Sequence, residues 1–271
     1  MAECCRQKRV GPWMKLSIIV PAYNEEERLA PMLDAYVGHF APLYGDNVEF
    51  IVVVNGSVDR TDEVAMDYQA AHSQVHVVVE PKRVGKGGAV IIGFRKARGG
   101  LVGFTDADGA TPPHAYQHLV EGIGEYGAII ASRWLPTSDV EPRQPAARRI
   151  ASRIFNAGVR WLFGLKITDT QCGAKLLRRE ALEVVLPRLG VTRWAFDVDL
   201  LFQLRRAGIL IREIPTTWHD VRGSKVNIPR ASAEMTLAMV RLRLLYSPFR
   251  WVVGLYDKTF GILARPWNEE D

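Results

Sequence analysis

The sequence predicts an α/β fold in which a mostly parallel central sheet carries helices on both faces. In the first half of the chain, continuous apolar runs of strand length alternate with segments of helical pattern. A strand that is apolar on both sides has both sides covered, which is typical of parallel sheets. A chain of 271 residues, 48% of them apolar, is long enough to bury a large core.

The first two strand–helix units carry clear boundaries. Leu16 to Val20 reads as a buried strand that ends at Pro21, and Asn24 is expected to cap the next helix, with Glu27 three residues on. A second apolar run extends to Val54, followed by an Asn-Gly-Ser turn and a helix expected from about residue 59.

Two further units follow in the same order. "VHVVVEPKRVGKGGAV" is a strand followed by a glycine-rich turn containing Lys86. "LVGFTDADGATPP" is a strand followed by Asp106 and Asp108 and then a helix start. Ligands of such sheets bind beyond the carboxyl ends of the strands, so these polar motifs are expected to share one crevice.

The second half has a different rhythm. We expect an amphipathic helix in 143–165 with basic residues on one side, a polar loop and a helix in 167–187, a helix in 193–208, and a late strand in 209–218. Residues 232–267 show apolar helical spacing that arginines and a proline interrupt. The expected organisation is a tail (1–14), one α/β domain (15–228) and a C-terminal amphipathic helical appendage (229–271).

Net charge and cysteine content limit the ligands and the cellular compartment to be expected. The net charge of +5 suits an anionic ligand or an acidic membrane surface, and we expect no nucleic-acid partner. Cys4, Cys5 and Cys172 have neither disulfide nor metal-ligand spacing, which favours a reducing, cytoplasmic compartment. The N-terminus lacks the apolar core of a signal peptide, and no stretch reaches the ~18 apolar residues of a membrane span. Any membrane contact is therefore expected to be peripheral.

Asp106 and Asp108 are the strongest candidates for chemistry. Two carboxylates so close together repel each other unless a cation lies between them. Hard oxygen ligands suit Mg²⁺ or Mn²⁺, which would leave positions open for a nucleotide diphosphate. The alternative is ordinary turn chemistry, in which aspartates are common.

Lys86 lies in "RVGKGGA", which is similar to a phosphate-binding loop at a helix start. The spacing is not that of a P-loop, and Ala89 has no hydroxyl to hold Mg²⁺, so an ATPase is disfavoured. The alternative is a flexible turn with a solvated lysine.

Other charged groups are more ambiguous. Asp197 and Asp199 diverge by about 200° on a helix, so one of them is expected to be functional and the other solvated. Arg148, Arg149 and Arg153 are either a phosphate-binding cluster or a solvated basic face. The C-terminal helical pattern fits core packing or an interfacial helix equally well.

Taken together, the motifs "VPAYNEE", "GKGGAV", "DADGAT", "DTQCGAKLLRREA" and "RWAFDVDLL" resemble the family 2 glycosyltransferases, and within them the dolichyl-phosphate glucosyltransferase type. The resemblance runs from about Leu16 to Tyr246. It implies a Rossmann-like GT-A fold, a nucleotide-sugar donor with UDP-glucose foremost, metal-dependent transfer with inversion, and a polyprenyl-phosphate acceptor. The positions that it implies for the nucleotide sugar are Pro21, Tyr23, Asn24, Glu25, Asn55, Lys86, Asp106, Ala107 and Asp197.

Two departures from that family bear on the ligands. Val54 and Asn55 stand where the family often has two acids, which makes the donor's identity less certain than donor binding. Many relatives carry a membrane span at one terminus, which this sequence lacks, so the C-terminal helix is the expected lipid contact.

A polyprenyl-phosphate acceptor would determine which residues the reaction needs. A phosphate monoester has its second pKa near ~6, so it attacks with little need of a base. Arginines suit such an acceptor because they pair bidentately with phosphate. The candidates for its seat are Arg133, Arg149, Arg153 and, from the resemblance, Lys225. Asp169 would orient the sugar, or act as a base if the acceptor is a hydroxyl.

Three rival functions stay open. One is transfer to a soluble hydroxyl acceptor, or from another nucleotide sugar. A pyrophosphorylase is disfavoured because "VPAYNEE" is not a glycine-rich nucleotide signature. A non-catalytic nucleotide-sugar-binding protein is suggested by the missing acids at Val54 and Asn55, although Asp106 and Asp108 speak against it.

Overall fold

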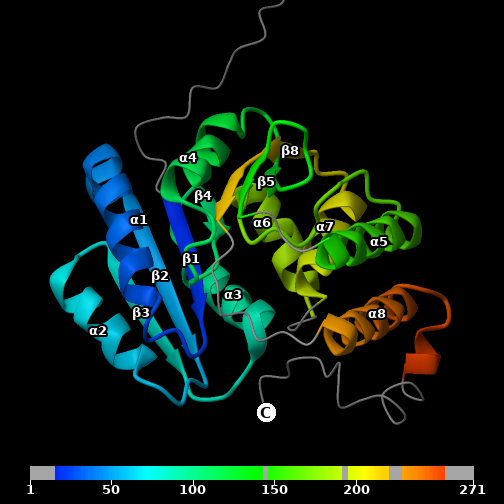
Figure 1. The fold of residues 1–271 in the computed structure, drawn as a ribbon, viewed down its shortest axis with the longest axis horizontal. Coiled ribbons are helices and arrows are strands. Elements are labelled where there is room, and N and C mark those ends of the chain that lie inside the picture. The colour runs from blue at the N-terminus through cyan, green and yellow to red at the C-terminus, as the bar shows by residue number, and fades with distance from the viewer. Residues whose placement is uncertain (1–15, 143–145, 191–194, 220–227, 254–271) are drawn as a thin grey trace, which may run out of the picture.

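The computed structural model describes residues 16–142, 146–190, 195–219 and 228–253 (Figure 1). The strands are β1 (Leu16–Ala22), β2 (Val48–Asn55), β3 (Val75–Glu80), β4 (Leu101–Phe104), β5 (Ala128–Ser132), β6 (Asp139–Glu141), β7 (Lys175–Arg178), β8 (Ile211–Pro215) and β9 (Thr217–His219). The helices are α1 (Leu29–Tyr44), α2 (Thr61–Ala71), α3 (Gly85–Lys96), α4 (Pro113–Gly122), α5 (Ala146–Phe163), α6 (Arg179–Val185), α7 (Phe196–Arg206) and α8 (Ile228–Leu245). Short 3₁₀ turns lie at Gly45–Asn47, Leu186–Arg188 and Arg250–Val252.

The main sheet has the strand order β3-β2-β1-β4-β7-β5-β8. Strands β3, β2, β1 and β4 run parallel to one another, and so do β5 and β8. Strand β7 is antiparallel to both of its neighbours, β4 and β5. The predicted mostly parallel sheet with helices on both faces is confirmed.

Strands β6 and β7 were not expected from the sequence, and β9 overlaps only the end of the late strand expected in 209–218. Strand β7 lies inside 167–187, where a loop and a helix were expected, and β6 and β9 pair in a separate small sheet. Each has only three or four residues, too few to show a period of two. Strand β7 is a strand because β4 and β5 enclose it and take up its backbone hydrogen bonds, which is a tertiary cause.

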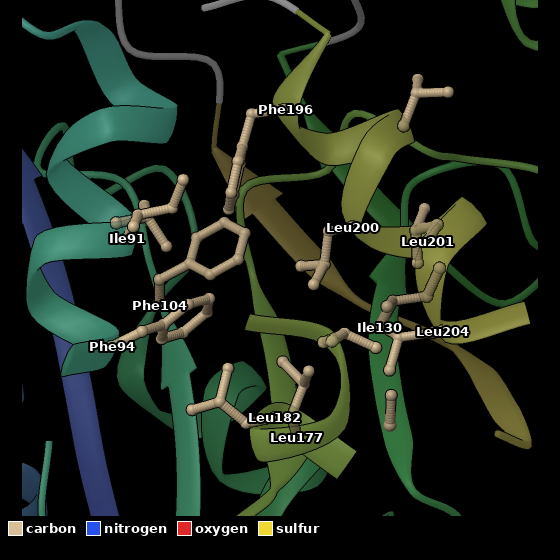
Figure 2. Packing of buried hydrophobic residues seen from close by; sticks show 14 of the residues in the cluster. Ile91, Phe94, Phe104, Ile130, Leu177, Leu182, Phe196, Leu200, Leu201 and Leu204 are labelled. Carbon is tan, nitrogen blue, oxygen red and sulfur yellow. The ribbon is translucent and has the colours of Figure 1, made fainter. Parts of the chain in front are cut away.

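Two hydrophobic clusters cover the two faces of the sheet. Helices α1, α2 and α4 contribute side chains to one of them, and α3, α6 and α7 to the other. Figure 2 shows the second cluster, in which Phe104 of β4 lies among Phe94 of α3 and Phe196 of α7. Their ring centroids are 6.1 and 6.0 Å from that of Phe104, in the range of favourable aromatic pairs.

The first helix begins later than predicted. Asn24 does not cap it: α1 starts at Leu29, and Asn24 has a positive φ of 54°. Its side chain instead accepts a hydrogen bond from the Val58 amide (3.0 Å) in the loop after β2. The amide of Glu25 donates to Thr61 Oγ1 (2.8 Å) in the same region. Residues 24–28 therefore join the ends of two strands before the helix begins, and a sequence pattern does not reveal that pairing.

Helices α5 and α8 pack against each other at the edge of the molecule remote from α1 and α2 (Figure 1). Met239 and Leu242 of α8 are buried in the second cluster, as are Val159 and Phe163 of α5. No helix in the described part of the chain is long and apolar enough to cross a membrane.

Candidate active site

Asp106 and Asp108 follow β4 at the carboxyl end of the sheet. The strand pairing continues one residue beyond β4, because the Thr105 amide donates to the Ile19 carbonyl (3.0 Å). Asp108 accepts a hydrogen bond from the Ala110 amide (3.0 Å), which holds the turn, and Ala107 between the two acids is buried. Burial raises the pKa of Asp108, and the neighbouring Asp106 charge raises it further. A divalent cation between the two carboxylates would relieve this repulsion.

Gly173 packs directly against Asp106. A Cβ built on Gly173 would lie 2.0 Å from Asp106 Oδ2, so no side chain fits there while that carboxylate keeps its position. Gly173 belongs to the "DTQCG" segment that precedes β7. The insertion of β7 beside β4 therefore brings the two motifs into contact, and the glycine shapes the space around Asp106.

Lys86 connects the acidic turn to α7. Its Nζ lies 2.6 Å from Asp106 Oδ1 and 3.9 Å from Asp197 Oδ2. Burial alone would lower the pKa of Lys86, but these two carboxylates raise it above its ordinary value, so the lysine is charged. Its position in the first turn of α3 confirms the predicted helix start. Its pairing with Asp106 argues against the alternative of a solvated lysine.

Lys175 extends this chain of charges, and the sequence analysis missed it. Its side chain is 1% exposed, and it donates hydrogen bonds to Asp197 and to the Cys172 carbonyl (2.7 Å). Burial would raise the pKa of Asp197, but Lys175 and Lys86 more than offset burial and hold it below its usual value. A lone lysine in the apolar run "AKLL" was the available signal, because a buried lysine requires a partner.

Asp197 and Asp199 have different surroundings, as their angular divergence predicted. The expectation that one of them is solvated was wrong: both are buried. Asp199 accepts hydrogen bonds from the Tyr246 hydroxyl (2.9 Å) and the Gly190 amide (3.3 Å), so it ties α7 to the end of α8. Packing of α8 on α7 covers it, which residue spacing alone cannot show.

The half-buried Arg133 and the fully buried Asp169 form a bidentate ion pair. Arg133 Nε donates to Asp169 Oδ2 (2.8 Å) and its Nη2 to Oδ1 (3.0 Å). Burial would raise the pKa of Asp169, but Arg133 holds it below its ordinary range. A fully buried carboxylate with a lowered pKa is a poor proton acceptor, so the geometry favours an orienting role for Asp169 over a base. The seat of the acceptor phosphate at Arg133 stays a prediction.

Asn55, the last residue of β2, links that strand to the end of β1 and the start of α3. Its Nδ2 donates to the Ala22 carbonyl (2.9 Å) at the end of β1, and its Oδ1 accepts from the Gly85 amide (3.2 Å) at the start of α3. Asn55 is thus an organiser of the strand ends as well as a predicted nucleotide contact. Pro21 and Tyr23 flank Ala22 in the sequence, and the Arg83 guanidinium is 4.2 Å from the Tyr23 ring centroid.

Glu25 lies near the acidic turn. Burial raises its pKa, Arg28 opposes the rise through a contact of 2.6 Å, and Asp108 and Asp106 add to it. The structure thus gathers Pro21, Tyr23, Asn24, Glu25, Asn55, Lys86, Asp106, Ala107, Asp108 and Asp197 at one end of the sheet, as the sequence analysis expected.

Two of the remaining predicted residues, Arg149 and Arg153, lie on α5. The Arg153 guanidinium lies 5.4 Å from the Trp134 ring centroid, next to Arg133 in sequence, while Arg149 is half-buried on α5. Lys225 lies outside the described residues. Strand β9 brings His219 to the acidic turn, where its amide donates to the Ala110 carbonyl (2.8 Å), and the sequence analysis did not single it out.

The acidic turn fits a hard divalent cation in charge and in ligand type. Asp106 and Asp108 supply carboxylate oxygens, and burial together with the neighbouring Asp106 charge raises the pKa of Asp108. Within the described ranges, no three His, Cys, Asp or Glu side chains converge as a metal site. A cation here would therefore draw its other ligands from water and a bound phosphate, which is usual for Mg²⁺.

The mostly parallel sheet flanked by helices, with an acidic turn at its strand ends, is a GT-A-like fold, the fold of a class of glycosyltransferases. The fold is similar to that of a glucosyl-3-phosphoglycerate synthase from Mycobacterium tuberculosis crystallised with UDP, with a TM-score of 0.63 at 20% identity over 85% of this chain and 79% of that one. Another crystal of that enzyme contains Mn²⁺, UDP and glucosyl-3-phosphoglycerate; it covers 86% and 79% of the two chains, with a TM-score of 0.62 and 21% identity.

The chain belongs to glycosyl transferase family 2, whose model matches residues 17–186. It is 38% identical to a dolichyl-phosphate beta-glucosyltransferase of Drosophila melanogaster over 80% of this chain and 70% of that protein. The relatives of the same name in Homo sapiens and Saccharomyces cerevisiae are 33% and 31% identical. These two alignments cover 89% of this chain and 78% and 76% of the relatives.

Proposed function

We propose that the protein transfers glucose from UDP-glucose to dolichyl phosphate or a related polyprenyl phosphate. The observation that carries the proposal is the similarity to dolichyl-phosphate beta-glucosyltransferases over more than three quarters of the chain. The site supports it independently, because an acidic turn, a paired lysine and a half-buried arginine lie at the strand ends, where ligands of such sheets bind.

The proposed reaction is a single displacement at the anomeric carbon. A phosphate oxygen of the acceptor forms the new bond to C1, the bond from C1 to the diphosphate oxygen breaks, and UDP leaves with that electron pair. This displacement inverts the configuration. The acceptor oxygen is already ionised near pH 7, so no base has to remove a proton. The ion-paired state of Asp169 agrees with that chemistry.

Each charged group then has a distinct task. Asp106 and Asp108 would hold Mg²⁺ or Mn²⁺, which when bound acts as a Lewis acid towards the leaving diphosphate. Lys86 adds a positive charge beside Asp106 at the N-terminus of α3, where backbone amides also favour phosphate. Asp169 orients Arg133, which together with Arg149, Arg153 and Lys225 is the proposed seat of the acceptor phosphate.

We also propose that the protein acts from the cytoplasmic side of a membrane, as a peripheral protein. A long-chain polyprenyl phosphate does not leave the bilayer, so the enzyme has to reach it at the surface. The cysteine usage supports a reducing compartment. The C-terminal helix remains the membrane contact predicted from the sequence.

The test is turnover with defined substrates. The purified protein, Mg²⁺, a polyprenyl phosphate and a panel of UDP- and GDP-sugars should yield glycolipid from UDP-glucose. Asp108→Asn should abolish product, and Asp67→Asn, an exposed acid on α2, should not change it. Release of UDP without glycolipid would favour a soluble acceptor. The absence of turnover with any sugar, together with retained UDP binding, would favour a non-catalytic binding protein.

A further inference from the structure

Helix α5 exposes an apolar stripe that the described part of the chain does not cover. Ile150, Ile154 and Trp161 are 58%, 67% and 84% exposed, and Ala157 between them is also exposed. Residues turn by about 100° each along a helix, so these four share a sector of about 60°. We call Ile150, Ile154, Ala157 and Trp161 the α5 stripe. Large apolar side chains in one exposed row mark an interaction surface.

The flank of the α5 stripe is strongly basic. Arg149, Arg153 and Arg160 occupy another sector of about 40° beside it, and Arg153 and Arg160 are exposed. The sequence of α5 contains four arginines and no acidic residue. An apolar row beside a basic row is the pattern of helices that lie in a membrane surface, where isoleucine and tryptophan enter the boundary layer and arginines meet lipid phosphates.

The opposite face of α5 is anchored in the protein next to the candidate site. Val159 and Phe163 are buried in the core, and Asn156 is 2% exposed. Asn156 Oδ1 accepts hydrogen bonds from the amide (2.9 Å) and the hydroxyl (2.8 Å) of Thr170, the residue after Asp169. One helix therefore holds the Asp169 loop on its inner face and presents the α5 stripe on its outer face.

We propose that the α5 stripe docks the protein on the surface of an anionic lipid bilayer. Charge favours a bilayer over a second copy of this chain. Two α5 helices packed on each other about a two-fold axis would bring their arginines together, and α5 has no acid to compensate them. Docking here would set the Asp169–Arg133 pair close to the lipid headgroups without any element crossing the membrane.

The first experiment measures binding to vesicles that contain no polyprenyl phosphate and no donor, so that its outcome is independent of the proposed reaction. Vesicles of phosphatidylcholine with phosphatidylserine should bind the full chain, and pure phosphatidylcholine should bind it much less. The double variant Ile154→Ser/Trp161→Ser should lower the partition coefficient about tenfold or more. Arg160→Gln should lower it about fivefold at low salt, and less at high salt.

Matched control variants distinguish binding through the α5 stripe from non-specific binding to vesicles. Leu43→Ser removes a 55% exposed leucine from α1, and Lys96→Gln removes an exposed cation from the last turn of α3. Neither should change vesicle binding. Circular dichroism should show unchanged folding for the α5 variants, because the altered side chains are exposed.

A site-specific probe gives a second readout. Ala157→Cys in a Cys4→Ser/Cys5→Ser background places a single accessible thiol in the α5 stripe, since Cys172 is buried. An environment-sensitive fluorophore on it should shift to the blue with anionic vesicles, whereas the same label at Leu43→Cys should not.

Three results would overturn the proposal. The first is vesicle binding that persists in Ile154→Ser/Trp161→Ser. The second is vesicle binding that is lost only in Phe249→Ser/Trp251→Ser. That variant removes the exposed aromatic residues after α8, so its result would assign docking to the C-terminal segment alone. The third is absent vesicle binding together with dimerisation in sedimentation equilibrium that Ile154→Ser/Trp161→Ser abolishes.

Discussion

Gly173→Ala should uncouple the acidic turn from its ligands while leaving the fold intact. The added Cβ would lie 2.0 Å from Asp106 Oδ2 and 2.5 Å from its Cγ, whereas a carbon and an oxygen in contact are about 3.3 Å apart. Cys172 and Ala174 on either side are buried, so the backbone has little room to retreat. The Asp106 carboxylate therefore has to swing by about 1 Å or more and would lose its contact with Lys86.

The cost should appear in ligand binding more than in stability. Turning one half-buried carboxylate off its rotamer costs about 1 kcal/mol, whereas misplacing a group that supports a metal lowers metal affinity or activity about 10- to 100-fold. Isothermal titration of Mn²⁺ in the presence of UDP should show this loss, and thermal unfolding should change little.

Gly38→Ala is the matched control. A Cβ on Gly38, inside α1, meets nothing within 4 Å, so this variant should bind Mn²⁺ and UDP normally and gain up to about 1 kcal/mol of stability. Wild-type affinity in Gly173→Ala, with the fold unchanged, would refute the reasoning, because it would mean that the position of Asp106 does not govern binding.

The remaining predictions concern the buried charges and the core beneath them. Lys175→Met should lower the free energy of unfolding by about 3 kcal/mol, because it leaves the buried Asp197 with only the more distant Lys86, 3.9 Å away. Urea denaturation should show the loss and also its recovery in Lys175→Met/Asp197→Leu. Phe104→Ala should lower the free energy of unfolding by about 3–5 kcal/mol. It should also reduce turnover, because the Nζ atoms of Lys86 and Lys175 lie 5.5 and 5.4 Å from the ring centroid of Phe104. Normal turnover in the folded variant would contradict this link. The pKa of Asp169 is lower in the folded than in the unfolded state, so its stabilising contribution is complete above the unfolded pKa of 3.8 and is lost as the pH falls through the folded pKa. The free energy of unfolding, measured from pH 6 downward, should therefore fall more steeply with pH in the wild type than in Asp169→Asn. Equal slopes would contradict this.

Local sequence pattern predicts structure best where a residue acts through its immediate neighbours. The buried runs of β1, β2 and β4 and the glycine-rich start of α3 follow from local pattern, as does the acidic turn after β4. Their convergence also followed, because parallel strands end at one edge of a sheet.

Local pattern does not predict the role of a residue whose partner comes from a distant part of the chain. Asn24 was expected to cap a helix but bonds to Val58 in another loop. Either Asp197 or Asp199 was expected in solvent, but both are buried, and Asp199 accepts a hydrogen bond from Tyr246. In both cases the residue type allows either role, and only the tertiary contact selects one.

The sequence by itself determined the α/β class, the family and the position of the acidic turn, because those depend on hydrophobic period and short motifs. Only the tertiary structure decided which charges pair. Strand β7, too short to be recognised, enters the sheet between β4 and β5 and brings Gly173 and Lys175 against Asp106 and Asp197. Buried charges are stable only beside opposite ones, and the packing of strands and helices determines which partner each of them meets.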